Sequence, residues 1–118
     1  MQDTIRSFKA ELFKALGHPG RLRIVELLRD GERSVSDLQA ACGTDGSAVS
    51  QHLAVLRARW VVEARRDGSN VYYRVRHPRV LAILDAGREI FADHLDDLRA
   101  SLDADIAAAA DEVDMVPA

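Results

Sequence analysis

The apolar residues of this chain recur at steps of three and four over much of its length, which predicts a mainly α-helical fold. The first helix is expected over about residues 4–16, with one apolar stripe formed by Ile5, Phe8, Leu12 and Leu16. The second is expected to begin at Pro19, a favoured first helical position, and to close at Gly31. Its predicted buried face holds Leu22, Val25 and Leu28.

Two further helices are expected close together. Ser36, with Gln39 three residues later, forms a capping-box pattern, and this short third helix is expected to stop at Gly43. Thr44 is the expected cap of a fourth helix over residues 45–58, whose buried side consists of Val49, Leu53 and Leu56. Two helices joined by so few residues predict a helix-turn-helix, in which the second helix enters a major groove.

After the fourth helix the apolar pattern changes to alternation. The stretch "VVEARRDGSNVYYRVR" reads as two β-rich runs around the turn Asp67-Gly68-Ser69-Asn70, which is typical of a hairpin. A hairpin directly after a recognition helix is a wing. The predicted fold class is therefore mainly α with a small β-hairpin, a winged helix-turn-helix.

A long last helix is expected from near Pro78 to about Ala110. Its apolar stripe is longer than this small domain can cover, so we predict a homodimer that pairs through the long C-terminal helix, with the N-terminal helix alongside as a second dimerisation helix. The expected interface residues are Leu84, Phe91, Leu95, Leu98 and Leu102. Residues 1–110 are expected to form a single domain, and residues 111–118 a frayed tail.

Charge is distributed unevenly along the chain and favours nucleic acid as a partner. Residues 1–46 are neutral, residues 47–79 hold seven Arg against two acids, and residues 80–118 hold two Arg against ten acids. A basic middle segment attracts phosphates, whereas the acidic segment should face away from them. The predicted contacts with double-stranded operator DNA are Ser47, Ser50, Gln51 and Arg57 on the fourth helix, and Arg65, Arg66, Ser69 and Asn70 on the wing.

Other features of the composition limit where the protein acts. No apolar run is long enough to span a membrane, and the N-terminus lacks the pattern of a secretory signal. Cys42 is the single cysteine, so no internal disulfide can form, which agrees with a reducing compartment. We therefore expect a cytoplasmic protein without a membrane partner.

Three features of the sequence allow an alternative interpretation. His52 lies at the edge of the apolar side of the fourth helix, and we expect it to be a packed histidine; a direct base contact is the alternative. Catalysis is not expected, because Ser50 and His52 point to different sides of one helix and no nucleophile elbow is present. A protein-interaction module, in which the acidic helix docks a partner, would not retain DNA at low salt.

Two stretches together resemble the ArsR/SmtB family of bacterial winged-helix repressors: "ALGHPGRLRIVELL" and "SVSDLQAACGTDGSAVSQHLAVLRARWVVEARRDGSNVYYRV". The set of His-Pro-x-Arg-Leu, Ser-x-His-Leu and Arg-Arg-x-Gly is specific as a combination, and the resemblance covers roughly residues 10–95. It implies a homodimer that binds a palindromic operator near a promoter. It also implies release of the operator when a small inducer, often a metal ion, binds.

The positions that would hold the inducer mostly depart from the family. Ser34-Val35-Ser36 stands where many members have Cys-Val-Cys, and a hydroxyl does not replace a thiolate ligand. The positions of the other usual metal site match His77, Arg79, Ile90 and Asp93, of which Arg79 and Ile90 are not ligands. No cofactor is therefore expected. A nonstandard metal site around His94 is the alternative, with candidate ligands His77, Glu89, Asp93, His94 and Asp97.

Trp60 is a further departure, because relatives commonly have glycine there as the left-handed residue that closes the recognition helix. Tryptophan disfavours a positive φ, so the helix end is expected to be built differently in this chain. Either the turn is strained or the helix closes elsewhere.

Overall fold

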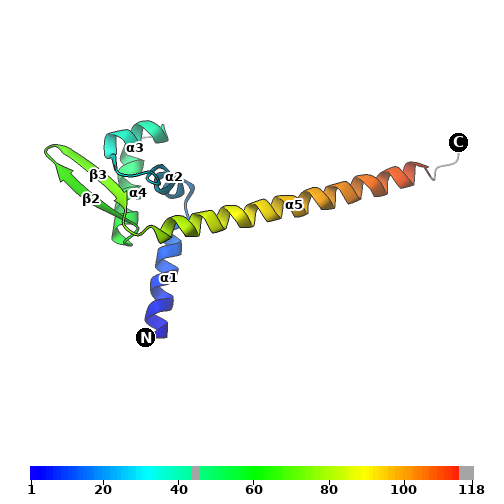
Figure 1. Ribbon diagram of the computed structural model, residues 1–118, viewed down its shortest axis with the longest axis horizontal. Coiled ribbons are helices and arrows are strands. Elements are labelled where there is room, and N and C mark those ends of the chain that lie inside the picture. The colour runs from blue at the N-terminus through cyan, green and yellow to red at the C-terminus, as the bar shows by residue number, and fades with distance from the viewer. Residues whose placement is uncertain (44–45, 115–118) are drawn as a thin grey trace. The chain divides into compact units, whose positions relative to one another are not determined.

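The computed structural model describes residues 1–43 and 46–114, and within these ranges it contains five helices and three strands (Figure 1). In chain order they are α1 (Gln2–Leu16), α2 (Pro19–Leu27), β1 (Arg33–Ser34), α3 (Val35–Cys42), α4 (Gly46–Ala58), β2 (Val62–Asp67), β3 (Asn70–Val75) and α5 (Arg79–Asp114). The chain divides into two compact units, Met1–Ala82 and Ile83–Ala118, with the boundary inside α5. One domain over residues 1–110 stays a prediction.

The core of the first unit lies among α2, α3, α4 and the start of the sheet. Helices α3 and α4 contact each other, and Leu38 of α3 and Leu53 and Leu56 of α4 are almost completely buried, as the apolar spacing predicts. The predicted buried face of α2 is shifted slightly, because Ile24 is fully buried and Leu22 only half-buried. The remaining buried apolar residues are Ala15, Leu16, Val25, Leu28, Val49, Val61, Val62 and Val80.

Helix α2 ends at Leu27, earlier than the predicted stop at Gly31. The backbone of Leu28 has ψ 2°, and its N–H donates to the carbonyls of both Ile24 and Val25, so the helix tightens into a turn there. Gly31, at φ 141°, follows this turn rather than the helix itself. The glycine therefore marks the end of the turn that leads into β1.

The cap of α3 is Ser34, so the prediction of a capping box at Ser36 and Gln39 is wrong. The Oγ of Ser34 accepts a hydrogen bond from the backbone N–H of Asp37 at 3.1 Å, and Ser34 has the extended backbone that a cap requires. Gln39 instead donates from Nε2 to the carbonyl oxygen of Gly46 at 3.3 Å, which ties α3 to the first residue of α4. Thr44, the predicted cap of α4, lies outside the described residues.

The predicted hairpin is confirmed and belongs to a three-stranded antiparallel sheet of order β1-β3-β2. Asp67 pairs with Asn70 across the two-residue loop, in which Gly68 has φ 62°, so a residue without a Cβ is favoured there. The short strand β1 was not predicted, because two residues are too few to show alternation. It pairs Arg33 and Ser34 with Tyr73 and Tyr72.

Trp60 does adopt the left-handed conformation, with φ 67°, so the expectation of a differently built helix end is wrong. The N–H of Val61 donates to the carbonyl of Leu56 at 3.0 Å, and the N–H of Trp60 donates to that of Arg57 at 3.2 Å. These two bonds form a Schellman motif, the usual closure with glycine at this place. Of the two alternatives, the strained turn is therefore the correct one. The side chain of Trp60 contacts Arg76, whose guanidinium lies 4.4 Å from the Trp60 ring centroid.

We expect Trp60→Gly to be more stable than Trp60→Ala by about 1 kcal/mol, because only glycine adopts this φ without a penalty. Both substitutions remove the exposed cation–π contact with Arg76, which is worth about 0.5–1 kcal/mol, so their difference isolates the backbone. Urea denaturation of the two variants measures it. Equal midpoints and slopes would show that the backbone at residue 60 is not strained.

The second unit consists of α5 beyond Ala82, a helix that continues four residues past the predicted end at Ala110. The rest of the predicted frayed tail, residues 115–118, lies outside the described residues. Large apolar side chains of this helix are between 52% and 70% exposed in the single chain: Ile90, Phe91, Leu98, Leu102 and Ile106. Among the described residues, no helix is both long and apolar enough to cross a membrane.

Candidate nucleic-acid interface

Helix α4 presents a polar face opposite its buried face. Its buried residues are Val49, Leu53 and Leu56, and the predicted contact residues Ser47, Ser50, Gln51 and Arg57 are all exposed. Gly43 has the left-handed φ of 62° that ends α3 and starts the turn toward α4. Helices α3 and α4 pack against each other, and the β2–β3 hairpin follows (Figure 1). The arrangement is that of a helix-turn-helix with a wing.

The arginines of residues 47–79 separate into a paired and an unpaired group. Four lie within 4.0 Å of a carboxylate, in the pairs Arg59–Glu11, Arg65–Glu32, Arg74–Glu63 and Arg76–Glu63. Within residues 1–43 and 46–114, the structure gives no such partner to Arg57, Arg66 or Arg79. Arg57 at the end of α4 and Arg66 on the wing therefore carry the positive charge that is open to phosphates.

Arg65 lies on the wing, as predicted, and its side chain is paired with Glu32. Its guanidinium makes two hydrogen bonds to the Glu32 carboxylate, at 3.1 Å and 2.6 Å, and lies 4.8 Å from the centroid of Tyr72. The bond from Arg65 lowers the pKa of Glu32, and the same bond raises the pKa of Arg65. Because neighbouring strand residues face opposite sides, Arg66 is directed away from this pair. Arg66, Ser69 and Asn70 are exposed at the end of the hairpin.

Glu32 is the functional residue that sequence reasoning missed. It lies thirty-three positions from Arg65, and only the pairing of β1 with β3 and of β3 with β2 brings the two side chains together. No local spacing signals such a contact. The pair links the loop before β1 to the wing.

His52 is half-buried on the side of α4 that meets the start of α2, in agreement with the predicted packed histidine. Its ring centroid lies 4.5 Å from that of His18, whose Nδ1 accepts the N–H of Gly20 at 2.9 Å. A Cβ on Gly20 would stand 2.7 Å from Nε2 of His52, so glycine is needed for this close approach. Burial lowers the pKa of His52, and the charges of His18 and Arg21 lower it further.

Stability should consequently decrease as the pH falls below 6.5, the ordinary value for histidine. In that range the unfolded chain binds a proton at His52 that the folded chain does not, so acid favours unfolding. We expect His52→Gln to reduce this dependence, measured as the urea midpoint between about pH 7.5 and about pH 5.5. A variant with the same pH dependence as the native protein would contradict the assignment.

Comparison with known proteins identifies the family. A family model described as "Bacterial regulatory protein, arsR family" matches residues 18–59, which include α2, α3 and α4. The HTH-type transcriptional regulator Rv0081 of Mycobacterium tuberculosis is 41% identical over 102 residues, which make up 86% of this chain and 90% of that protein. The chain belongs to the ArsR family. Prediction of this family from the sequence is confirmed.

Solved structures of ArsR-type proteins share the fold. The crystal structure of Rv0081 aligns with a TM-score of 0.71 at 42% identity, over 79% of this chain and 94% of that one. The homodimeric winged helix-turn-helix DNA-binding domain of a possible ArsR-family regulator from Mycobacterium bovis aligns with a TM-score of 0.73 at 31% identity, covering 81% and 89% of the two chains. The predicted winged helix-turn-helix is therefore confirmed.

The family also decides between the predicted classes of function. ArsR proteins are DNA-binding transcriptional regulators and not enzymes, so this chain is a DNA-binding transcriptional regulator. Catalysis through Ser50 and His52 is thereby excluded. The interpretation as an interaction module without DNA binding is excluded as well.

The cysteine metal site of some ArsR members does not fit these residues. At the matching place, the Ser34 hydroxyl is engaged as the cap of α3, and Ser36 is exposed in its first turn. Hydroxyls lack the soft thiolate character that such sites need. The nonstandard alternative is not assembled within one chain, because residues 1–43 and 46–114 contain no group of three or more His, Cys, Asp or Glu placed to hold a metal. Its candidates Glu89, Asp93, His94 and Asp97, like His77, are exposed.

Proposed function

We propose that this ArsR protein is a homodimeric repressor that inserts two copies of α4 into successive major grooves of a palindromic operator. The observation that carries the proposal is the exposed polar face of α4 together with Arg57 and Arg66, two of the arginines that have no carboxylate partner within residues 1–43 and 46–114. Repression is supported by a relative, the biofilm growth-associated repressor of Xylella fastidiosa, which is 38% identical over 82 residues that span 70% of this chain and 72% of that protein. The proposed location is the cytoplasm.

Each predicted contact residue has a role that follows from its chemistry. Gln51 offers an amide that reads adenine with two hydrogen bonds, and Ser47 and Ser50 offer hydroxyls to bases or phosphates. Arg57 and Arg66 bind phosphates, the second from the wing, with Ser69 and Asn70 beside it. Arg65 holds the wing through Glu32 instead of contacting DNA.

The exposed apolar stripe of α5 is the surface that binds the second subunit in this proposal. Phe91, Leu98 and Leu102 are each more than half exposed in the single chain, and they recur at the spacing of one helix face. So long an apolar face in water favours association with a second copy. Two-fold symmetry of the dimer would then match the two halves of the operator.

Removing the wing's free charge tests the DNA-binding assignment. We expect Arg66→Ala to weaken binding to operator and random DNA alike and to lower the slope of log affinity against log salt by about 0.9. Arg65→Ala is the matched control, because it removes the same charge from the same strand but from a side chain held by Glu32. Fluorescence anisotropy over a salt series measures both, and equal slope changes would contradict the assigned roles.

A further inference from the structure

The ion pair between Arg65 and Glu32 spans the full width of the wing sheet. Arg65 lies on β2 at one edge of the sheet, and Glu32 directly precedes β1 at the other edge. Strand β3 runs between them, and its Tyr72 pairs with Arg65 on one side and with Ser34 of β1 on the other. The Arg65 side chain therefore crosses the middle strand to reach the Glu32 carboxylate, and its guanidinium lies over the Tyr72 ring.

Three side chains hold the Arg65 guanidinium in this position. Its Nε and Nη2 donate to the two oxygens of Glu32 at 3.1 Å and 2.6 Å, which is the bidentate geometry of a strong arginine–carboxylate pair. Its Nη1 lies 4.0 Å from an oxygen of Asp67, and one face of the guanidinium lies over Tyr72. With two carboxylates beside one guanidinium, this part of the wing presents no excess positive charge to a phosphate.

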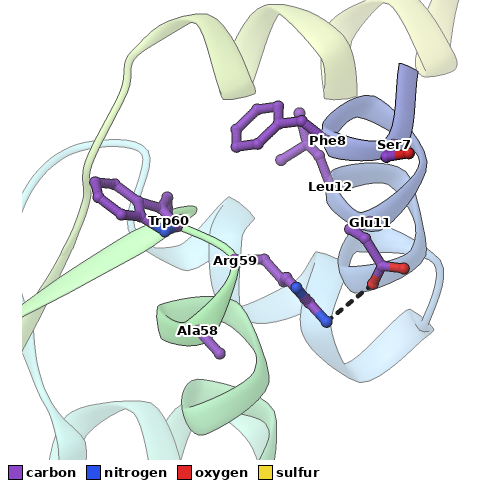
Figure 2. Close-up of a pocket in the computed structure, with 7 residues that line it drawn as sticks. All are labelled: Ser7, Phe8, Glu11, Leu12, Ala58, Arg59 and Trp60. Carbon is purple, nitrogen blue, oxygen red and sulfur yellow. Dashed lines mark ion pairs between the residues drawn. The ribbon is translucent and has the colours of Figure 1, made fainter. Parts of the chain in front are cut away.

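Other arginines of residues 47–79 are held by close neighbours. Figure 2 shows the Arg59 guanidinium beside the carboxylate of Glu11, at 3.0 Å. Arg74 donates to Glu63 at 2.6 Å, and these two residues stand directly opposite each other in the register of β2 and β3. Cross-strand pairs of this kind join side chains that are already neighbours. The pair of Arg65 differs, because it turns the arginine inward over the sheet toward a carboxylate beyond the next strand.

Without its acidic partner, Arg65 could extend in the opposite direction. Strand β2 is an edge of the three-stranded sheet, so no further strand of this sheet blocks a side chain that points outward from it. The Arg65 side chain is 55% exposed even when it is paired, and Arg66 follows it directly in the chain. A released guanidinium at this edge would be a second phosphate-binding group on the wing, and each phosphate that a protein neutralises adds about 0.9 to the salt dependence of binding.

We infer that Glu32 is a positioning residue that holds Arg65 away from the DNA backbone and thereby limits the sequence-independent affinity of the wing. The inference rests on the proposed contact of the wing with DNA. Arg66, on the opposite side of the strand, then supplies the wing's phosphate contact alone. Weaker sequence-independent binding leaves more of the protein free to find its operator, because a genome offers a very large number of competing random sites.

Glu32→Gln tests the inference in the full-length protein, because glutamine has the same shape without the charge. We expect the slope of log affinity against log salt for random duplex DNA to steepen by about 0.9 for each wing, and the affinity to rise roughly tenfold for each wing at about 0.05 M salt. Fluorescence anisotropy over a salt series measures both. Asp30→Asn is the matched control, because it removes the same charge from the same connection between α2 and β1. Within residues 1–43 and 46–114, Asp30 has no arginine partner, so its slope should stay native.

A double-mutant cycle shows whether the effect passes through Arg65. Arg65→Ala should change the slope little in the native protein, but in the Glu32→Gln background it should remove the added 0.9 for each wing. Arg65→Lys is a second variant that leaves Glu32 in place. Lysine keeps the charge but cannot form two parallel bonds, so its slope should lie between those of the native protein and Glu32→Gln.

Three results would overturn the inference. The first is a Glu32→Gln protein that binds random DNA no more tightly than the native protein, and the second is an equal gain in Asp30→Asn, which would show a general effect of charge. The third is an equal effect of Arg65→Ala in both backgrounds. An unchanged slope in Arg66→Ala would instead contradict the proposed contact of the wing with DNA, so the two failures are distinguishable.

Discussion

Leu98→Asp is expected to convert the dimer to monomers and to weaken operator binding by about a hundredfold to ten-thousandfold. Leu98 lies on the apolar stripe of α5 and is 52% exposed in the single chain, so pairing with a second copy would bury it. In a symmetric interface the substitution buries two carboxylates, each unpaired and each costing several kcal/mol. A monomer holds only one half-site, and the loss of linked binding gives the expected range of affinities.

Sedimentation equilibrium and anisotropy with operator DNA measure the two effects. Ala100→Asp is the matched control, because residue 100 follows two positions later and lies about 160° from the stripe. That variant adds the same charge to the opposite face of the helix and should remain dimeric. A Leu98→Asp protein that still sediments as a dimer would refute the proposed interface.

The periodicity of apolar residues was sufficient to predict the helices and the wing. Helix α4 buries one face, so the spacing of its apolar residues records the fold directly, as at Leu53 and Leu56. Helix ends were predicted less well, because several residues compete for each cap. Ser34 and Ser36 both have the chemistry of a cap, and the extended backbone that β1 imposes on Ser34 decides between them.

Only the total charge of the candidate interface could be predicted from the sequence, and not the partner of each arginine. Seven arginines among residues 47–79 indicate a basic segment, but their partners come from other elements. Glu11 of α1 holds Arg59, and Glu32 in the loop before β1 holds Arg65. Which arginines remain open to DNA depends on these long-range contacts, which local spacing does not show.

At Trp60, the local preference of the residue and the observed backbone disagree. Its side chain disfavours the left-handed region, so local preference argues against the observed backbone. The Schellman bonds of Trp60 and Val61 and the burial of Val61 and Val62 directly after it outweigh a penalty of about 1–2 kcal/mol. Tertiary packing therefore sets the end of α4, and the tryptophan side chain is left exposed beside α1.

Gln51→Ala is expected to lower the preference for operator over random DNA by about 1–3 kcal/mol, the value of one bidentate contact between a side chain and a base. Gln51 is exposed on α4, opposite the buried Leu53 and Leu56, so its removal should leave the free energy of unfolding nearly unchanged. The ratio of operator to random-DNA affinity at one fixed salt concentration is the quantity to measure.

Arg57→Ala provides the contrast on the same helix. Its guanidinium, which has no carboxylate partner among the described residues, is assigned to a phosphate, so both affinities should fall together, and their ratio should stay constant. Base reading and backbone binding are then separated within one element of the structure. If Gln51→Ala kept the native ratio while Arg57→Ala reduced it, the specific base contact would come from Arg57 and not from Gln51. Arginine can make such a contact, because its guanidinium reads guanine with two hydrogen bonds.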